Sequence, residues 1–475
     1  MKSLAILVVF IFICNAIAVG VNEINKDIKD EAKIKSTNKI KNKIKTDTKK
    51  YDLLILCPSI FYEPLYALKL HKEKYGIKTI IVTLDEIYHS KYFPCKGRDN
   101  AEMVKYFIKN AYDNWHIKYV LLVGGRKPGK AERWYMPVRY VYNQDVDGFW
   151  SEPRFLSDLY FADIYDSDGK FSSWDTNGNG IYGEWIGEKA QDIIDLYPDV
   201  YVGRWPARNA FEVEIMVEKT IEYEKNAYGK EWFKRIVVAA GDTYPEYPGY
   251  EGEETTSQAM QYMQGFEIIR LYTSEGTLNS WKDIVAEVNK GCGFLYLDGH
   301  GNPMSWTTHL PRNEEWIDDF DVFKMIHLKN KGKYPICIVG GCHNSQFNVT
   351  IFNSFSWKHI YKGENSPECW SWWITRKING GAIATIGCTA LGYTKEDKST
   401  WDGATTWLEP RFFWEYGING TDVLGEVWGK AIIAYLNKYK IDWNTPAGWD
   451  YSIDAKTVQE WCLFGDPSLK IGGYS

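Results

Sequence analysis

The chain lacks the regular cysteine spacing of a disulfide framework or of a metal–thiolate site. Nine cysteines are spread over 475 residues, and no CxxC pair or short repeated interval connects them. Cys57, Cys337 and Cys462 lie inside apolar runs and are predicted to be core residues. The sequence therefore specifies no disulfide pairing, although an exported protein could form disulfides.

Beyond its N-terminus the sequence also lacks an apolar run long enough to cross a bilayer. The N-terminus itself has the pattern of a secretory signal peptide: Lys2, an apolar stretch from Leu4 to Ile13, and the small-residue site Ala16-Ile17-Ala18. We predict a signal peptide over residues 1–18. The expected product is secreted or held at the exterior of the cell envelope, with no membrane span after signal cleavage.

Residues 19–50 form a lysine-rich segment, which has ten lysines and five acidic residues. It has too few apolar side chains to order itself and is predicted to be a linker or a pro-segment. The segment carries a formal charge of +5 and Lys2 adds +1, so the total of −6 leaves −12 on the rest of the chain. This acidic remainder argues against nucleic acid as a partner and favours basic ones.

Strand-like apolar runs alternate with helical patterns along the rest of the chain. A first series predicts strands at 53–57, 79–84 and 119–123, with helices at 62–74 and 100–113. A second series predicts strands at 235–240, 267–271, 293–298, 335–339 and 382–386, with helices near 210–227, 253–264 and 281–289. Such alternation is typical of α/β folds, in which helices cover both faces of parallel sheets.

The two series predict two α/β/α-sandwich subdomains with mostly parallel sheets. The first subdomain covers residues 51–229 and the second covers residues 230–475, and the two join near Gly203 to Lys230. Strands that end in a pair of reactive side chains occur only in the second series. The second subdomain is therefore predicted to be catalytic.

Two apolar runs of the second series end in reactive side chains. GFLYLDGHG ends in His300 and Gly301, and PICIVGG leads into Cys342. Ligands of open α/β sheets bind outside the carboxyl ends of the strands, so neighbouring strands would bring a base and a thiol together. Either residue alone is more often structural. The pair favours a hydrolase with a cysteine nucleophile.

These residues resemble the active-site blocks of the gingipain-type cysteine peptidases, which share the caspase–legumain fold. The active-site blocks are HG at 300–301 and CHNSQF at 342–347. Four other segments also look like that family: YDLLILCPSIFYEPLYALKLHKEKYGIKTIIV, PDVYVGRWPARNAFEVEIMVEKTIEYEK (198–225), GGAIATIG (380–387) and LFGDPSLKI (463–471). The resemblance extends from about Tyr51 to Ile471 and implies a caspase-like catalytic subdomain.

The resemblance implies a cysteine endopeptidase that needs no cofactor for catalysis. Cys342 would attack the scissile carbonyl to form an acyl-enzyme thioester, and His300 would protonate the leaving amine. The backbone N–H groups of Gly301 and Cys342 would hold the oxyanion. Asp242 would orient the imidazole, although it is nearly as well explained as an ordinary turn residue. His343 is a poor base, because adjacent side chains point apart.

The resemblance also implies protein or peptide substrates cleaved after basic residues, which need an acidic pocket. Glu253 or Glu254 is the expected pocket residue, and the alternative is a helix N-terminus that simply favours acids. Cys388, a rival nucleophile without its own His-Gly partner, is expected in the pocket wall. With an acidic pocket, the lysine-rich segment would itself be a substrate, so self-processing is a hypothesis.

A separate motif, DTNGNGIYGEW from Asp175, matches the first half of an EF-hand-type calcium loop. Position 12 is Ile186 instead of the usual glutamate, so we predict a shortened loop that holds a structural Ca²⁺. The expected ligands are Asp175, Asn177, Asn179, the Ile181 carbonyl and Glu184. The alternative is a cluster of Asn-Gly turns.

Two other functions stay open at the level of sequence. One is an inactive protein of the peptidase fold that binds peptides or glycans at the cell surface, for which aromatic clusters such as CWSWW (369–373) could serve. The other is a transpeptidase, because an amine can capture the same thioester as water. Both His300 and Cys342 are present, which favours the peptidase.

Overall fold

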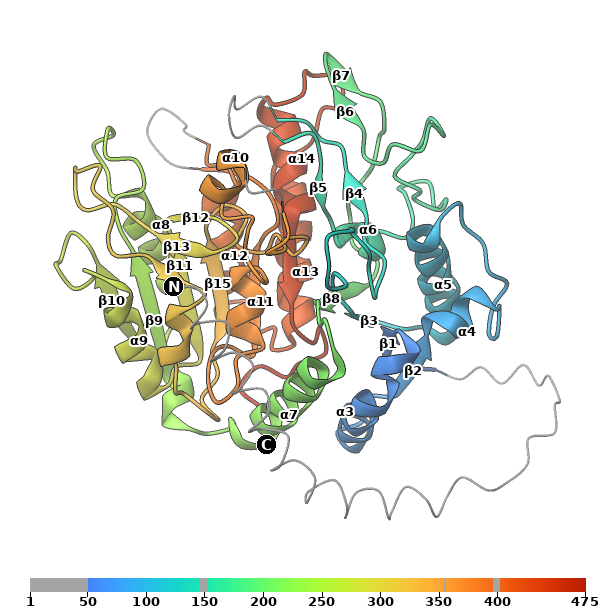
Figure 1. Cartoon of the computed structure of the whole chain (residues 1–475), viewed down its shortest axis with the longest axis horizontal. Coiled ribbons are helices and arrows are strands. Elements are labelled where there is room, and N and C mark those ends of the chain that lie inside the picture. Colours follow the sequence, from blue (N-terminus) through green and yellow to red (C-terminus); the bar gives the residue numbers. More distant parts are fainter. Residues whose placement is uncertain (1–49, 146–151, 354–355, 396–401) are drawn as a thin grey trace. The chain divides into compact units, whose positions relative to one another are not determined.

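The computed structural model describes residues 50–145, 152–353, 356–395 and 402–475 (Figure 1). Contacts divide the chain into residues 1–48 and 49–475, and the fold described here is that of the second unit. The predicted signal peptide (1–18) and almost all of the lysine-rich segment (19–50) lie outside the described residues. Within the described part, no helix is both long and apolar enough to cross a membrane.

The first sheet has four parallel strands in the order β2-β1-β3-β8. Its strands are β1 (Leu53–Cys57), β2 (Thr79–Thr83), β3 (Tyr119–Val123) and β8 (Tyr201–Trp205). The main helices beside it are α3 (Tyr62–Lys74), α5 (Asn100–Trp115) and α7 (Ala210–Asn226). Asp99 and Asn209 begin α5 and α7, each accepting a hydrogen bond from a backbone N–H of the first turn.

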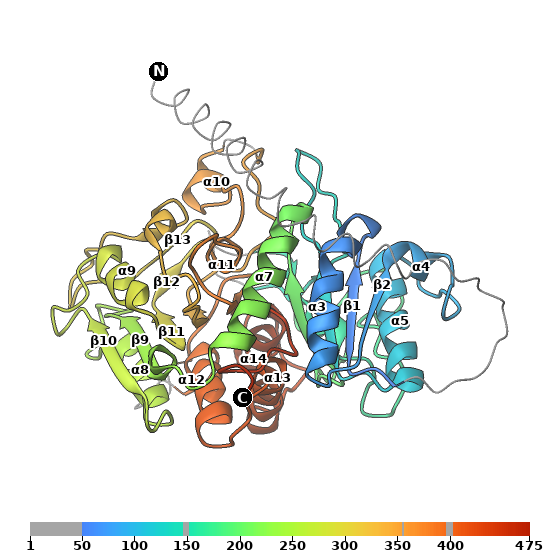
Figure 2. The same cartoon turned by 90° about the horizontal axis from the view of Figure 1, so that it is seen from below.

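Side chains of β1 alternate between two hydrophobic cores, as a strand covered on both faces requires. Leu53 and Ile55 pack in one core with residues of α3 and α7, whereas Leu54 and Leu56 pack in the other with residues of α5. Helices α3 and α7 lie side by side (Figure 2). The first subdomain is thus an α/β/α sandwich.

The second sheet has six strands in the order β10-β9-β11-β15-β16-β17. Its strands are β9 (Arg235–Ala240), β10 (Glu267–Tyr272), β11 (Phe294–Asp298), β15 (Ile336–Gly340), β16 (Ala384–Cys388) and β17 (Trp461–Phe464). Its helices are α8 (Glu251–Met260), α9 (Trp281–Lys290), α11 (Trp370–Thr375), α12 (Thr405–Gly417), α13 (Leu424–Lys438) and α14 (Asp450–Glu460). One core packs the sheet against α9 and α11, and another packs it against α8, α12 and α13.

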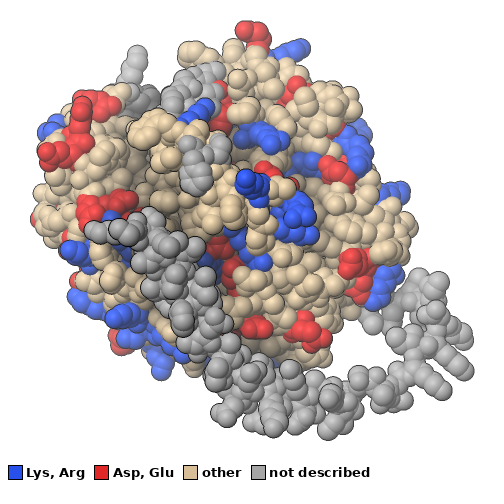
Figure 3. Space-filling view, viewed as in Figure 1, with Lys and Arg blue, Asp and Glu red and all other residues tan. Residues whose placement is uncertain are grey.

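Short elements complete the described chain. The helices are α4 (Leu84–Tyr88), α6 (Leu159–Ala162) and α10 (Trp357–Tyr361), with 3-10 turns η1 (Ser59–Phe61), η2 (Glu231–Lys234) and η3 (Lys324–His327). The strands are β4 (Tyr140–Val141), β5 (Phe155–Leu156), β6 (Trp185–Ile186), β7 (Lys189–Ala190), β12 (His300–Gly301), β13 (Ser305–Thr307) and β14 (Phe320–Asp321). On the face shown in Figure 3, acidic and basic side chains are interspersed.

The predicted fold class, two α/β sandwiches with mostly parallel sheets, is confirmed. The two sheets are separate, and the predicted junction, Gly203 to Lys230, begins within β8 and ends before β9. Residues 49–475 nevertheless form one compact unit, in which β8 contacts β17. A Cβ at Gly203 of β8 would lie 2.3 Å from the Gly465 carbonyl oxygen, so glycine is required for this close approach. The antiparallel β17 was not predicted, because an apolar run does not reveal its direction.

Candidate active site

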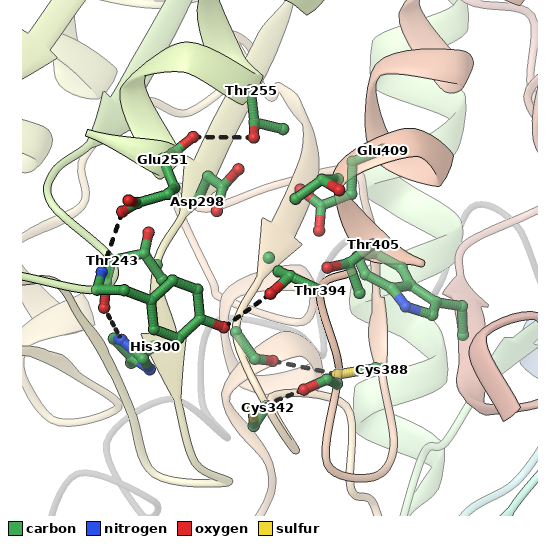
Figure 4. Close-up of a pocket in the computed structure, with 18 residues that line it drawn as sticks. Thr243, Glu251, Thr255, Asp298, His300, Cys342, Cys388, Thr394, Thr405 and Glu409 are labelled. Carbon is green, nitrogen blue, oxygen red and sulfur yellow. Dashed lines mark hydrogen bonds between the residues drawn. The ribbon is translucent and has the colours of Figure 1, made fainter. Parts of the chain in front are cut away.

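Two neighbouring strands of the second sheet bring His300 and Cys342 together. In the parallel pair of β11 and β15, Asp298 lies opposite Gly340, and each reactive residue follows two positions later. The Gly299 N–H donates to the Gly340 carbonyl at 2.8 Å, which keeps the two strand ends adjacent. Both side chains line one small cavity of about 40 Å³ (Figure 4). The juxtaposition predicted from the two strand ends is therefore present.

The imidazole of His300 has a backbone partner. Its Nε2 lies 2.8 Å from the carbonyl oxygen of Thr243, which can only accept a hydrogen bond. Nε2 therefore carries the proton, and in the neutral ring the free lone pair is on Nδ1. Burial lowers the pKa of His300 below its ordinary value, so the neutral ring is favoured in the free protein.

Cys342 as a whole residue is half-buried. Its thiol lies 3.7 Å from the Gly392 carbonyl oxygen, and burial raises the pKa of Cys342 to about 12. A thiol with this pKa is protonated at neutral pH and needs a base to become nucleophilic. Among the described contacts, no hydrogen bond joins Cys342 to His300. Such bonds are often long before substrate binds.

Asp242 occupies a different place from the one that the resemblance implied. Its Oδ2 accepts a hydrogen bond from the backbone N–H of Arg312 at 2.6 Å, and its Oδ1 is buried without a described partner. His300 instead donates the hydrogen bond that fixes its ring to the carbonyl of the next residue, Thr243. The loop that follows β9 thus orients the imidazole through its backbone, because the turn directs the Asp242 side chain to Arg312.

The two predicted oxyanion donors belong to backbone segments that lie close together. A Cβ at Gly341 would lie 3.1 Å from the Gly301 nitrogen, and a Cβ at Gly301 would lie 2.3 Å from Oδ1 of Asn344. Only glycine fits at these two positions without displacing the neighbouring chain. The Asn344 Nδ2 donates to the carbonyls of Asn302 and Ser305 and so ties the segments together.

The acidic residues of the cavity differ from the predicted ones. Glu253 binds Ser274 and Thr273 outside the cavity, and the side chain of Glu254 is exposed. The prediction of Glu253 or Glu254 is therefore corrected: the acidic residue of this helix that lines the cavity is Glu251. Glu251 and Glu253 are two residues apart and so lie on opposite faces of α8, which the acidic run in the sequence does not reveal.

Two further carboxylates line the cavity beside Glu251. Asp298 lies between Glu251 and Glu409, which comes from α12 (Figure 4). Burial, followed by the charge of Glu251, raises the pKa of Asp298 well above its ordinary value. Burial, followed by the charge of Asp298, does the same to the pKa of Glu409. No Lys or Arg is among the described residues that line this cavity.

Sequence reasoning missed Asp298 and Glu409 for different reasons. Asp298 stands two residues before His300 at the end of the same strand, so its position was a usable signal. Glu409 comes from a helix far along the chain, and its sequence carries no motif. Tyr296 donates a hydrogen bond to Glu409 at 2.8 Å, and a Cβ at Gly340 would collide with the Glu409 carboxylate.

Cys388 and His343 lie beside the nucleophile in different environments. Cys388 ends β16 in the cavity wall, where its thiol donates to the carbonyls of Gly341 and Ala390, both at 3.3 Å. Burial raises its pKa well above the ordinary value. The His343 ring is directed to the Glu152 carboxylate, with Nε2 3.3 Å from Oε2. The structure therefore gives neither residue the arrangement of His300 and Cys342.

In the predicted calcium loop, side-chain carboxylates accept hydrogen bonds from N–H groups of the same loop. Asp175 accepts hydrogen bonds from the N–H groups of Asn179 and Gly180, each at 3.0 Å. The Glu184 carboxylate accepts from the side-chain amides of Asn177 and Asn179. The oxygen donors suit Ca²⁺.

One contact competes with a metal ion in this loop. Asp175 also forms an ion pair with the guanidinium of Arg98, so a calcium ion would compete with that cation. Among the described residues, no group of three or more His, Cys, Asp or Glu is arranged to hold a metal. Calcium binding therefore stays a prediction.

Comparisons with known proteins agree on one family. The family model described as peptidase family C25 matches residues 46–472. Gingipain R2 of Porphyromonas gingivalis (strain ATCC BAA-308 / W83) is 22% identical over 428 residues, which cover 88% of this chain and 46% of that protein. Lys-gingipain W83 of P. gingivalis is 23% identical over 247 residues, or 49% of this chain and 12% of that protein.

Solved structures agree on the fold. The crystal structure of the Arg specific cysteine proteinase gingipain R matches with a TM-score of 0.60 at 18% identity and covers 91% of this chain and 80% of that one. The complex of P. gingivalis RgpB pro- and mature domains matches with a TM-score of 0.59 at 18% identity, covering 88% and 79%. The chain thus spans less than half the length of either curated relative, but most of each solved chain.

Proposed function

The chain belongs to peptidase family C25, and from this premise we propose that it is a cysteine endopeptidase acting through an acyl-enzyme thioester. The observation that carries this proposal is that His300 and Cys342 follow adjacent strands and line the same cavity. An inactive binding protein of the same fold would have no need for both groups.

In the proposed reaction Cys342 attacks the scissile carbonyl, while His300 accepts the thiol proton and passes it to the leaving amine. This transfer is necessary because the Cys342 pKa of about 12 keeps the resting thiol protonated. Nε2 of His300 already donates to the Thr243 carbonyl, so Nδ1 exchanges the proton. The N–H groups of Gly301 and Cys342 hold the oxyanion, and water then releases the acyl group.

We also propose that the substrate residue before the scissile bond is basic. Three carboxylates, those of Glu251, Asp298 and Glu409, line a cavity whose described lining has no Lys or Arg to balance them. Buried carboxylates without a cation are costly, and a Lys or Arg side chain from the substrate would supply the missing charge. The printed names of two relatives, Lys-gingipain and Arg specific cysteine proteinase, also refer to basic residues.

Export and self-processing complete the proposal. The signal-peptide pattern in residues 1–18 supports secretion, and a protease that cuts after lysine would find ten candidate bonds within residues 19–50. Removal of part of this segment by the protein itself is therefore expected. A structural calcium ion in the loop from Asp175 to Glu184 is proposed on its oxygen donors alone.

The test is covalent labelling with acyloxymethyl ketones that carry Lys, Arg, Asp or Asn. We expect the Lys and Arg reagents to label Cys342 of the calcium-loaded protein, as located by mass spectrometry, and His300→Ala to abolish the labelling. Cys388→Ser separates the rival thiol, because Cys342 should still be labelled in that variant. The N-terminal mass of wild type, compared with that of Cys342→Ala, reports self-processing.

Each outcome has a distinct meaning. Labelling by the Asp or Asn reagent would keep the mechanism and reject the basic preference. Labelling of Cys388 instead of Cys342 would reassign the nucleophile. Absence of labelling by all four reagents, before and after limited proteolysis, would reject the peptidase in favour of a binding protein. Identical N-terminal masses in wild type and Cys342→Ala would reject self-processing.

A further inference from the structure

Three aromatic rings surround the imidazole of His300. The ring centroids of Tyr244, His309 and Trp316 lie 5.9, 5.4 and 5.1 Å from that of His300, at interplanar angles of 88°, 76° and 85°. These are edge-to-face arrangements, which restrict ring rotation and contribute about 0.5–1.5 kcal/mol per aromatic pair. The described hydrogen bond to Thr243 fixes one ring nitrogen, and the three rings restrict tilting around it.

His309 and Trp316 act as one unit. Their rings are in contact, with centroids 3.5 Å apart and planes inclined by 32°. The backbone of His309 forms antiparallel bridges with both Asp242 and Trp316, and its Nδ1 lies 3.1 Å from the Glu314 carbonyl oxygen. The His309 backbone is thus bridged to the loop after β9 that supplies the Thr243 carbonyl, while its ring nitrogen is held by Glu314.

Trp316 is unusual for its position, because 51% of this large apolar residue is exposed. An exposed indole that packs on a buried histidine and touches the catalytic imidazole is hard to explain by core packing alone. Its position would shield the neighbouring imidazole from solvent, and the indole face can stabilise an adjacent imidazolium.

We propose that His309 and Trp316 are positioning residues that hold the imidazole of His300 in its productive orientation. The inference rests on the proposed peptidase function, because it assigns to His300 the role of proton donor. The two residues need not touch the substrate. They act through His300, and Tyr244 completes the ring of contacts on another side.

His309 also links the site to its charged surroundings. The negative charges of Asp242 and Glu246 oppose the lowering of the His309 pKa, and the charge of Glu246 does the same for the pKa of His300. Burial lowers the pKa of His309, which favours the neutral ring near pH 7. When His309 does gain a proton, its charge opposes protonation of His300. Replacement of His309 by a neutral residue should therefore raise the pKa of His300.

The first experiment separates catalysis from binding with Trp316→Leu and Trp316→Phe. On a peptide amide with a basic residue before the scissile bond, we expect Trp316→Leu to lower kcat about tenfold, because a small misplacement of a catalytic group slows the reaction. KM should change less than about twofold, and Trp316→Phe should restore most of kcat. Trp281 packs against His327 outside the cavity, with ring centroids 5.1 Å apart, so Trp281→Leu is the matched control.

The second experiment does not require activity. In protein labelled with ¹³C-histidine, the pKa of His300 is measured by NMR in wild type, His309→Gln and the control His327→Gln. We expect a rise of about half a unit or more in His309→Gln only. In an active enzyme, the acidic limb of the kcat/KM profile, along which neutral His300 gains its proton, should move to higher pH by the same amount.

The outcomes separate the two proposals. If Cys342 is labelled but the Trp316 and His309 variants match their controls, the positioning role is rejected and the peptidase stands. A change in KM instead of kcat for Trp316→Leu would make Trp316 a substrate contact and also reject it. If no substrate is cleaved, the peptidase is rejected, and an unchanged pKa of His300 in His309→Gln rejects the coupling separately.

Discussion

At the scale of single residues, the cavity combines a neutral imidazole and thiol with acids that are costly to ionise. His300 and Cys342 both favour their uncharged forms, because burial lowers the pKa of one and raises that of the other. The neighbouring carboxylates are shifted toward their neutral forms for the same reason. A cationic substrate side chain would lower the pKa of these carboxyls again. The pH and the charge of the substrate should therefore both change their ionisation.

The first prediction concerns Glu409 and pH. On acidification the raised pKa values of Asp298 and Glu409 make these acids gain protons at a higher pH than ordinary carboxyls, whose pKa is about 4. The attraction for a basic substrate is then lost. The ratio of kcat/KM for a lysine substrate to that for its norleucine analogue should therefore rise with pH, while effects on the catalytic pair cancel in the ratio.

Glu409→Gln should lower kcat/KM for the lysine substrate roughly 30-fold, or about 2 kcal/mol, as expected for loss of one buried charge partner. The norleucine analogue should be affected much less, and the ratio should depend less steeply on pH. The matched control is Glu254→Gln, whose carboxylate is exposed. Equal losses for both substrates would show that Glu409 supports the fold of the cavity and does not select charge.

At the scale of elements, the features that could be predicted are those encoded by a short stretch of neighbouring residues. Strands such as β1 and β11 are short, nearly continuous apolar runs, so their positions followed from the sequence. His300 and Cys342 end two such strands and were found in the same way. Glu409 and Trp316 reach the site by tertiary packing from other segments, and nothing in their local sequence records that approach.

Orientation within an element was harder to predict than its position. Helix α8 was expected near 253–264 and lies at Glu251–Met260, and this small shift changes which acid faces the cavity. A difference of two residues turns a helical side chain by about 200°. The direction of the Asp242 side chain likewise depends on the geometry of a turn, which the sequence does not determine.

The second prediction concerns the loop from Asp175 to Glu184. If this element holds a structural Ca²⁺, millimolar Ca²⁺ should raise the Tm of wild type by several degrees, because a ligand that binds only the folded state stabilises it. EDTA should reverse the increase. Asp175→Asn should abolish the response to calcium, while Glu188→Gln, an exposed acid of the next turn, should retain it. A Tm that does not respond to calcium in wild type would leave Arg98 as the only cation of this carboxylate.

At the scale of the whole described unit, the two sheets are joined by buried ions as well as by apolar contacts. Lys72 of α3 is fully buried, and its Nζ lies 2.7 Å from carboxylate oxygens of both Glu224 and Asp466. Glu224 belongs to α7, and Asp466 follows β17 at the end of the second sheet. Glu224 also accepts from the backbone N–H of Lys470 and lies 2.9 Å from Nε2 of His71. One ammonium group thus balances acids of both subdomains.

The third prediction is that Lys72→Met destabilises the unit by about 3–5 kcal/mol, because it leaves two buried carboxylates without their cation. Methionine fills a similar volume, so the loss should reflect charge more than packing. The free energy of unfolding in urea measures it, with Lys74→Met, an exposed neighbour on α3, as the control. The double variant Lys72→Met/Glu224→Gln should recover part of the loss, since it removes one of the two orphaned charges. If Lys72→Met unfolds like its control, apolar contacts such as those of β8 with β17 hold the sheets together alone.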